Sequence, residues 1–189
     1  MSAPELRTAR LRLRRWNDDD LEPFARLNGD PEVMAHFPAT LDPVQSGVLA
    51  ALADQGLADR RYGLWAVEVV DVVGFAGFLG LSSPTWDAVF TPCVEIGWRL
   101  DRPWWGRGYA TEGAQEVLRY AFEDLGLDEV VSFTSLTNVR SARVMARLGM
   151  VRDRAEDFDH PNIDAGHPLA RHMLCRIDRD RWLDLSRQD

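Results

Sequence analysis

The pattern of hydrophobic and polar positions predicts a chain of alternating strands and helices. Residues 11–16 alternate apolar with charged side chains, as a half-buried strand does. Apolar side chains at helical spacing follow, and the helix that they predict ends near Gly29. Asp42 supplies a capping oxygen and Pro43 a favoured first helical residue, so a second helix is expected to run to about Arg60.

The middle of the chain predicts a hairpin, another strand and a long helix. Residues 64–70 and 72–81 are rich in Val, Phe and Trp, which favours two antiparallel strands. Residues 93–100 form a further expected strand, in which Gly97 takes a position that often marks a bulge. Apolar side chains then repeat at helical spacing over residues 110–125.

The last third predicts a strand at 129–135, a helix at 141–148 that Gly149 ends, and a late strand at 172–177. This order of elements indicates an α/β fold with a mixed, mostly antiparallel sheet flanked by helices. No repeat or linker divides the chain. We therefore expect a single domain over residues 1–189.

Composition narrows the classes of function. The chain has 189 residues, 46% of them hydrophobic and 28% charged, which is typical of a folded domain; its core should span about residues 6–183. Twenty-two basic and 30 acidic side chains give a net charge of −8, which repels phosphate backbones and anionic membranes. We expect no nucleic-acid or membrane partner. Two cysteines, Cys93 and Cys175, are too few for a disulfide framework, so a cytoplasmic location is expected.

A glycine-containing loop precedes the long predicted helix. Gly106 and Gly108 allow backbone N–H groups to converge, the helix start adds partial positive charge, and Arg107 adds a full charge. A pyrophosphate fits these three features. Thr111 stands where a dinucleotide-binding loop needs its third glycine, and no P-loop motif is present. Glycines that serve only a tight turn are the alternative. The four histidines lack metal-ligand spacing, so no metal is expected.

Four short segments resemble the signature of the GNAT acyl-CoA N-acyltransferases, most closely the branch of ribosomal-protein N-terminal acetyltransferases. These segments are Trp98–Leu100, Trp104–Glu112, Thr137–Ser141 and Arg147–Met150. The resemblance implies a GNAT-type fold with acetyl-CoA as co-substrate, and it extends over nearly the whole chain.

The resemblance also implies which residues contact the coenzyme. They are Trp98, Leu100, Trp105, Gly106, Arg107, Gly108, Tyr109, Ala110, Thr111, Asn138 and Ser141. Trp105 replaces the Gln or Arg that usually begins the pyrophosphate loop. Asn138 matches a position that contacts the pantetheine arm, and Ser141 one near the sulfur. The alternative for both is a helix cap. The tyrosine that many members use as an acid falls at Met145.

Glu95 is the candidate catalytic base, and Ser141 the candidate proton donor. Glu95, Gly97 and Arg99 share one face of the predicted strand, and Glu95 is the only carboxylate in that strand. A glutamate there could accept the proton of an attacking amine directly or through water. A structural role for Glu95 is the alternative. Glu112 lies in the first turn of the long helix, where it is expected to favour the helix dipole.

These observations predict an N-acetyltransferase that acts on a primary amine, with a protein N-terminal α-amine as the preferred acceptor. A small amine, such as an amino acid, polyamine or aminoglycoside, is the alternative acceptor. A non-catalytic acyl-CoA-binding module is the alternative of another class, because the family's tyrosine is missing. A homodimer is compatible with the sequence.

Overall fold

The structure is a computed structural model that describes residues 3–187 and contains two compact units. The first comprises residues up to 82 together with 97–117, and the second comprises 83–96 and the residues from 118 onward. Strand β5 (Glu95–Leu100) carries the chain from the second unit into the first. The α/β class with a mostly antiparallel sheet, expected from the sequence, is confirmed.

The sheet of the first unit is built from consecutive antiparallel strands. Their bounds are β1 (Leu6–Arg7), β2 (Leu11–Arg14), β3 (Leu64–Val69) and β4 (Val73–Ser82). Leu11 pairs with Val69 and Leu13 with Val67, so both leucines are fully buried while the intervening arginine faces the other way. The predicted hairpin is confirmed, and Asp71 at its turn has a φ of 58°.

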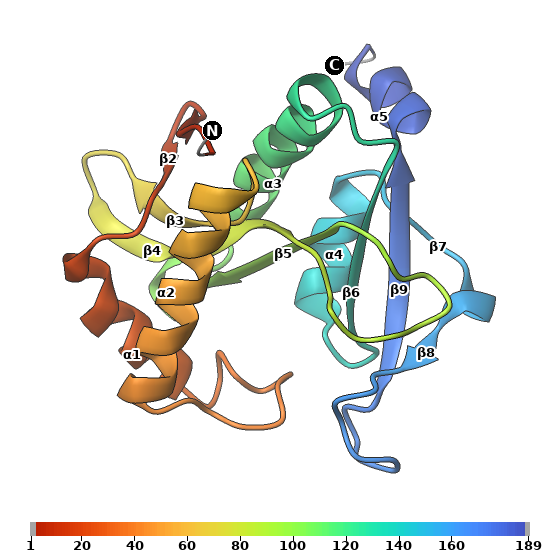
Figure 1. Ribbon diagram of the computed structural model, residues 1–189, viewed down its shortest axis with the longest axis horizontal. Coiled ribbons are helices and arrows are strands. Elements are labelled where there is room, and N and C mark those ends of the chain that lie inside the picture. The colour runs from red at the N-terminus through yellow and green to blue at the C-terminus, as the bar shows by residue number, and fades with distance from the viewer. Residues whose placement is uncertain (1–2, 188–189) are drawn as a thin grey trace. The chain divides into compact units, whose positions relative to one another are not determined.

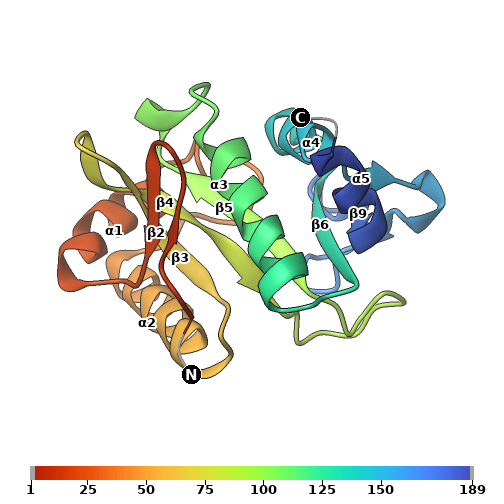
Figure 2. The same cartoon turned by 90° about the horizontal axis from the view of Figure 1, so that it is seen from above.

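Helices cover both faces of this sheet. Figures 1 and 2 show α1 (Leu21–Gly29) and α2 (Pro43–Asp59) on one side of β2–β4 and α3 (Tyr109–Arg119) on the other. On the first face Phe24 of α1 and Ala50 of α2 pack with Phe78 of β4. On the second face α3 approaches β4 so closely that a Cβ at Gly113 would lie 2.5 Å from Leu79 Cδ2.

The start of α2 agrees with its sequence prediction. The Asp42 side chain accepts a hydrogen bond from the Gln45 N–H at 2.8 Å, and the Gln45 side chain accepts one from the Asp42 N–H at 3.0 Å. This reciprocal cap, followed by Pro43, fixes the first turn. The short helix η1 (Asp18–Asp20) is capped by Asn17 and leads into α1.

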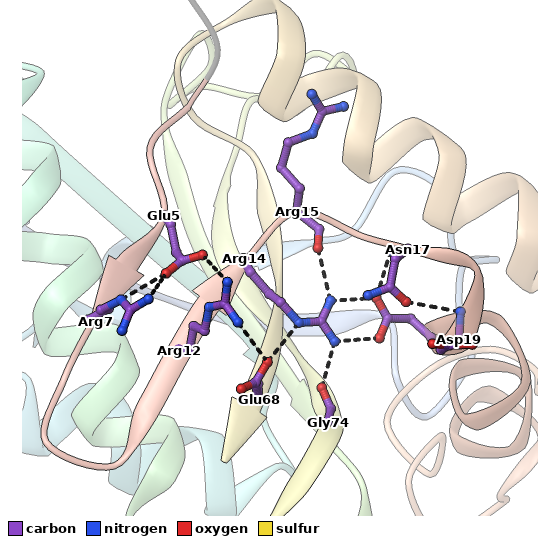
Figure 3. Close-up of polar contacts among 10 residues, drawn as sticks. Glu5, Arg7, Arg12, Arg14, Arg15, Asn17, Asp19, Glu68 and Gly74 are labelled. Carbon is purple, nitrogen blue, oxygen red and sulfur yellow. Dashed lines mark hydrogen bonds and ion pairs between the residues drawn. The ribbon is translucent and has the colours of Figure 1, made fainter. Parts of the chain in front are cut away.

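Arg14 ties strand β2 to the start of the helical layer (Figure 3). Its guanidinium donates to Asp20 at 2.8 and 2.7 Å, to Glu68 at 3.1 Å and to the Gly74 carbonyl at 2.6 Å. Asp20 is only 1% exposed. The two carboxylates and the carbonyl therefore satisfy the positive charge of Arg14 within the protein.

The second unit is organised around β6 (Glu129–Ser135) and β9 (Arg171–Asp178). These strands pair antiparallel along the whole of β6, from Glu129 opposite Asp178 to Ser135 opposite His172. Val131 of β6 pairs in parallel with Glu95 of β5. The short strands β7 (Val151–Arg152) and β8 (Phe158–Asp159) pair with β9. The predicted bounds of β6 are confirmed, while two-residue strands such as β1 carry too little pattern to predict.

Helices of this unit follow the sequence pattern except at the C-terminal end. A π-helical turn at Tyr120–Asp124 follows α3, and α4 (Val139–Arg147) ends before Gly149, whose φ is 76°. The short helix η4 (Arg154–Glu156) lies between β7 and β8. The final helix α5 (Arg179–Ser186) was not predicted. In residues 3–187, no helix is both long and apolar enough to cross a bilayer.

Aromatic and imidazole rings form a cluster in the second unit, made of Trp86, Phe90, Phe133, Phe158, His160 and His172. The ring centroids of Trp86 and His160 lie 4.9 Å apart, and those of His160 and His172 lie 5.0 Å apart. Burial lowers the pKa of both histidines below the ordinary value. The rings pack against one another and hold Trp86 and Phe90 of the 83–96 segment against Phe133 of β6 and Phe158 of β8.

Candidate active site

The predicted pyrophosphate loop lies between the short helix η2 (Arg102–Trp104) and α3. Gly106 has a φ of 73° and Gly108 a φ of 83°, values that L-residues with a side chain rarely adopt. No described atom lies within 4 Å of a Cβ built at Gly106, and only Arg10 Nη2, at 3.4 Å, approaches one built at Gly108. The loop therefore needs glycine for its backbone, and the space that side chains would fill stays open.

The start of α3 supplies hydrogen-bond donors to this loop. Glu112 donates its N–H to the Gly108 carbonyl at 3.0 Å and is the first residue to bond back into the helix. The N–H groups of Tyr109, Ala110 and Thr111 precede it, and the first N–H groups of an α-helix have no acceptor within the helix. These donors and the helix dipole favour an anion, as the predicted pyrophosphate contact requires.

Arg107 adds a cation beside the loop. Its Nε donates to the Pro103 carbonyl at 3.0 Å, and its Cζ lies 5.5 Å from the centroid of the Trp104 ring. These contacts hold the side chain against η2 while leaving it exposed. Arg107 is thus placed on the same loop as the glycines, and its contact with the coenzyme stays a prediction.

A second cation, Arg10, was missed by the sequence analysis. Its guanidinium bonds Glu112 Oε2 through Nε at 2.6 Å and Nη2 at 2.5 Å, and it lies 4.7 Å from the centroid of the Tyr109 ring. Glu112 Oε1 also accepts from Thr8 Oγ1 at 2.6 Å and from the Arg10 N–H at 3.0 Å. Glu112 therefore does more than favour the helix dipole, because it positions Arg10. The only feature of the sequence that points to this arrangement is that Thr8 and Arg10 directly precede the strand predicted at 11–16.

Electrostatics around Glu112 reflect this arrangement. Burial would raise the pKa of Glu112, but the hydrogen bonds from Thr8 and Arg10 outweigh burial and hold its pKa below the ordinary value. Glu112 is consequently ionised at neutral pH, and it keeps the Arg10 guanidinium next to Gly108.

Trp105 turns its side chain toward the protein. Its Nε1 donates to the Leu100 carbonyl at 2.7 Å, and its ring packs against the cluster that contains Phe24 and Phe78. Leu100 is buried and Trp98 partly buried on β5. The indole of Trp105 is thus engaged in packing, which leaves its backbone as the group for the predicted coenzyme contact.

The residues predicted to contact the pantetheine arm begin helix α4 in the second unit. Asn138 Oδ1 accepts from the Ser141 N–H at 3.1 Å, and Asn138 Nδ2 donates to Thr134 Oγ1 at 2.9 Å. Asn138 is therefore a helix cap, as its alternative interpretation proposed, and this cap places Ser141 in the first turn. Met145, one turn later, is 1% exposed and offers no acidic proton.

Glu95 is the first residue of β5, and Cys93 lies two residues before the strand, which begins later than the predicted residue 93. Glu95 is partly exposed and pairs in register with Val131. Burial, with a smaller effect from the charge of Glu95, raises the pKa of the Cys93 thiol to about 11. Cys93 is thus protonated at neutral pH and a poor nucleophile. Over the described part of the chain, no three His, Cys, Asp or Glu side chains gather to hold a metal ion.

Comparisons with known proteins agree with this geometry. Residues 10–151 match the model of a family described as an acetyltransferase (GNAT) domain. A protein of Aspergillus fumigatus, named FsC-acetyl coenzyme A-N(2)-transacetylase, is 33% identical over 201 residues, which cover 97% of this chain and 80% of that protein.

Two solved structures from Vibrio cholerae share the fold. One is proposed to be a ribosomal-protein-serine acetyltransferase, with a TM-score of 0.74, 15% identity and coverage of 94% and 99% of the two chains. The other is a spermidine N-acetyltransferase in complex with CoA and spermine, with a TM-score of 0.72, 18% identity and coverage of 93% and 99%. The same fold thus occurs with different acceptors, so the fold does not identify the acceptor.

Proposed function

Because this chain belongs to the GNAT acetyltransferase family and is an acetyl-CoA-dependent N-acetyltransferase, we propose that its acceptor is the α-amine of a protein N-terminus. Support comes from the resemblance of residues 104–112 and 137–141 to the ribosomal-protein branch, and from a structural neighbour proposed to act on a ribosomal protein. The structural observation that best supports acetyl-CoA binding is the open glycine loop at the start of α3.

In this proposal the glycine loop binds the pyrophosphate of the coenzyme. The N–H groups of Tyr109, Ala110 and Thr111 donate to phosphate oxygens, and Arg107 and Arg10 supply positive charge. By the family resemblance, Asn138 contacts the pantetheine arm and Ser141 lies near the sulfur. A backbone N–H near Gly97 stabilises the oxyanion that develops on the acetyl carbonyl.

The amine attacks the thioester directly. Its nitrogen bonds the acetyl carbonyl carbon, the C–S bond breaks, and sulfur leaves with the bonding electron pair. One proton moves overall from nitrogen to sulfur, which balances the reaction. The raised pKa values of Cys93 and Cys175 argue against a covalent acetyl-cysteine intermediate, because both thiols stay protonated at neutral pH.

Proton transfer is assigned to Glu95 and Ser141. Glu95 accepts the proton of the amine, directly or through water, and Ser141 or a water protonates the thiolate. Met145 cannot take the acid role that a tyrosine has in many relatives, because it is a buried thioether. The same face of β5 that carries Glu95 also carries Gly97.

A small amine is the second candidate acceptor. It is favoured by the Aspergillus fumigatus relative, whose name specifies acetyl transfer to an N(2) position of FsC and which covers nearly the whole of this chain. The two candidates share every step above and differ only in the acceptor.

Thiol release from acetyl-CoA tests the proposal across N-terminal peptides of ribosomal proteins, amino acids, polyamines and aminoglycosides, with mass spectrometry to locate the acetyl group. The proposal predicts that kcat/KM is highest for peptides and that the acetyl group is on the α-nitrogen. A higher kcat/KM for small amines would identify a small amine as the acceptor and exclude the protein N-terminus. Coenzyme binding without thiol release from any acceptor would argue against acetyl transfer itself.

A further inference from the structure

Arg99 is held rigidly inside the first unit. Its Nη1 donates to Asn28 Oδ1 at 2.6 Å, and Asn28 Nδ2 in turn donates to Ser46 Oγ at 3.1 Å. Asn28 lies in the last turn of α1, Ser46 lies in the first turn of α2, and both are fully buried. An arginine has only donors, so Asn28 must present its oxygen to Arg99 and its nitrogen to Ser46. The side chain of Arg99 is thereby fixed in one direction from β5.

The positive charge of Arg99 has no negative partner within the described residues. Its contacts are neutral: the amide of Asn28 and the rings of Phe37 and Phe78, whose centroids lie 4.0 and 5.2 Å from the guanidinium carbon. Burial lowers the pKa of Arg99 to about 10, and no neighbouring carboxylate reverses this effect. Arg14 shows the contrast, because Asp20 and Glu68 meet its charge. Arg99 is therefore a protonated cation that the protein leaves uncompensated.

Two of its nitrogens still have hydrogen-bonding capacity. Nε is buried and has no acceptor in the part of the chain that the structure describes. Nη2 also makes no hydrogen bond there and, unlike Nε, is not fully buried. Nε and Nη2 form one edge of the planar guanidinium. That edge has the spacing of two carboxylate oxygens.

We propose that Arg99 binds a carboxylate of the acceptor, so that the substrates of this enzyme are primary amines with a carboxylate a few bonds from the nitrogen. This inference rests on the proposed acetyl transfer. Arg99 lies two residues from Gly97, about 7 Å along the strand, and the Gly97 backbone is the proposed site of the reacting carbonyl. The carboxylate binds at Nη2, the nitrogen of this edge that is not fully buried, and supplies the missing negative charge. A polyamine, which offers only further cations, is a poor substrate.

Matched acceptor pairs test this assignment by measuring kcat/KM for acetyl transfer. Each pair has the same amine with its carboxylate free or converted to a carboxamide. One set consists of free amino acids and their amides, and the other of N-terminal peptides with Asp or Glu against Asn or Gln near the amine. The wild type should prefer the carboxylate member of at least one set by about 10-fold to 100-fold, as expected for a hydrogen bond between charged groups. The set that shows the preference identifies the source of the carboxylate.

Two variants assign the preference to Arg99. Arg99→Gln should reduce the preference to near unity while leaving coenzyme affinity unchanged. Asn28→Asp keeps Arg99 but places a carboxylate beside it, so this variant should lose the same preference and unfold at a higher temperature. Arg26→Gln is the control, because it removes one arginine from an exposed α1 ion pair with Glu22 and should keep the preference.

Binding separates failure of this inference from failure of the proposed function. Carboxylate acceptors should raise the melting temperature of the coenzyme-loaded wild type more than their amides do, even where no thiol is released. Thiol release with equal kcat/KM for both members of every pair would overturn the role of Arg99 and leave acetyl transfer intact. The role of Arg99 would also be overturned if Arg99→Gln kept the carboxylate preference. The same holds if Arg99→Gln lost coenzyme affinity and not the preference.

Discussion

The guanidinium of Arg10 is clamped by the carboxylate of Glu112, with Arg10 Nε and Nη2 at 2.6 and 2.5 Å from Glu112 Oε2. This pair joins the segment before β2 to the first turn of α3. Arg10 Nη2 also approaches within 3.4 Å of the position that a Cβ at Gly108 would take. The ion pair therefore fixes one wall of the glycine loop.

Substitution Glu112→Gln should lower the free energy of unfolding by about 1.5–3 kcal/mol, the range for hydrogen bonds to a charged group. A glutamine would turn its own N–H groups toward Arg10 or Thr8, which are donors. Urea denaturation of both proteins measures the difference. The coenzyme dissociation constant should also rise, because Arg10 loses its position.

The stability difference should depend on pH in one direction. The pKa of Glu112 in the folded protein lies below its ordinary value, so its stabilisation is fully present above the unfolded pKa of about 4.3. The stabilisation is lost as pH falls through the folded pKa. The stabilities of the wild type and Glu112→Gln should therefore converge as the pH falls from the unfolded pKa through the lower folded pKa of Glu112. A difference that stayed constant to the lowest pH at which both proteins fold would exclude the ionised Glu112 as its source.

Gly108→Val should weaken coenzyme binding severely while the protein still unfolds cooperatively. The valine would adopt a strained positive φ and would extend into the open space beside the helix start. Gly166→Val is a matched control, because Gly166 has a φ of 86° and nothing described lies within 4 Å of its Cβ position. Both variants should lose about 1–3 kcal/mol of stability from strain. In calorimetry with acetyl-CoA, equal affinities for the two variants would remove the loop from the coenzyme site.

Acetyl-CoA should raise the melting temperature of the protein, whereas NAD and ATP at the same concentration should raise it only weakly. All three ligands carry a pyrophosphate for the glycine loop, but only acetyl-CoA has a pantetheine arm for the predicted contacts at Asn138 and Ser141. A ligand at 100 times its dissociation constant stabilises the folded state by about 2.7 kcal/mol. Thermal denaturation compares the three ligands. Equal shifts would mean that the loop binds phosphates without selecting the coenzyme.

Asn138→Ala should raise KM for acetyl-CoA, and Ser141→Ala should lower kcat more than it changes KM. Asn138 also caps α4, so its loss should cost about 1 kcal/mol of stability as well. Asn138→Asp separates the effect on KM from the effect on stability. Aspartate keeps the oxygen that caps α4 but lacks the amide N–H groups, one of which donates to Thr134. Full turnover of Ser141→Ala at every pH would leave Ser141 as a helix residue and assign the proton to water.

Glu95→Gln should reduce turnover most at low pH when the acceptor is an α-amine. Such an amine, with a pKa of about 7.7–8.0, becomes neutral without help as pH rises, so activity should partly recover. A lysine or polyamine amine, near pKa 10.4 in model peptides, stays charged, and the defect should persist across the accessible range. The pH profile of kcat/KM for Glu95→Gln and the wild type, recorded with each acceptor, measures the size of the defect and its recovery. A profile that overlays the wild type would exclude Glu95 as the base.

Regular periodicity explains why most of the fold could be predicted from the sequence. The buried leucines of β2, the Asp42–Pro43 start of α2 and the glycine stop of α4 each follow from local rules, and the structure confirms them. Helix α5 was missed although Asp178 caps it. The Asp178 side chain accepts from the Arg181 N–H, but few apolar residues mark the face that the helix turns inward.

The candidate site was predictable only where its chemistry resides in a contiguous segment. The glycine loop is one such segment, so its residues could be named in advance. The Arg10–Glu112 pair joins residues 102 positions apart, and Arg99 meets Asn28 across 71 positions. Such partners become neighbours only through the register of the sheet and the packing of α1 and α2. No local pattern in one sequence shows them.

The strand order ends in β1 on one side and β7 on the other, and each has only two residues. A sheet edge that is long and flat is a template on which a strand of another molecule can polymerise. Here the terminal strands offer very short rows of backbone groups, and charged Arg7 and Arg152 occupy half of their positions. These two ends of the strand order therefore present few backbone groups on which a strand of another molecule could add.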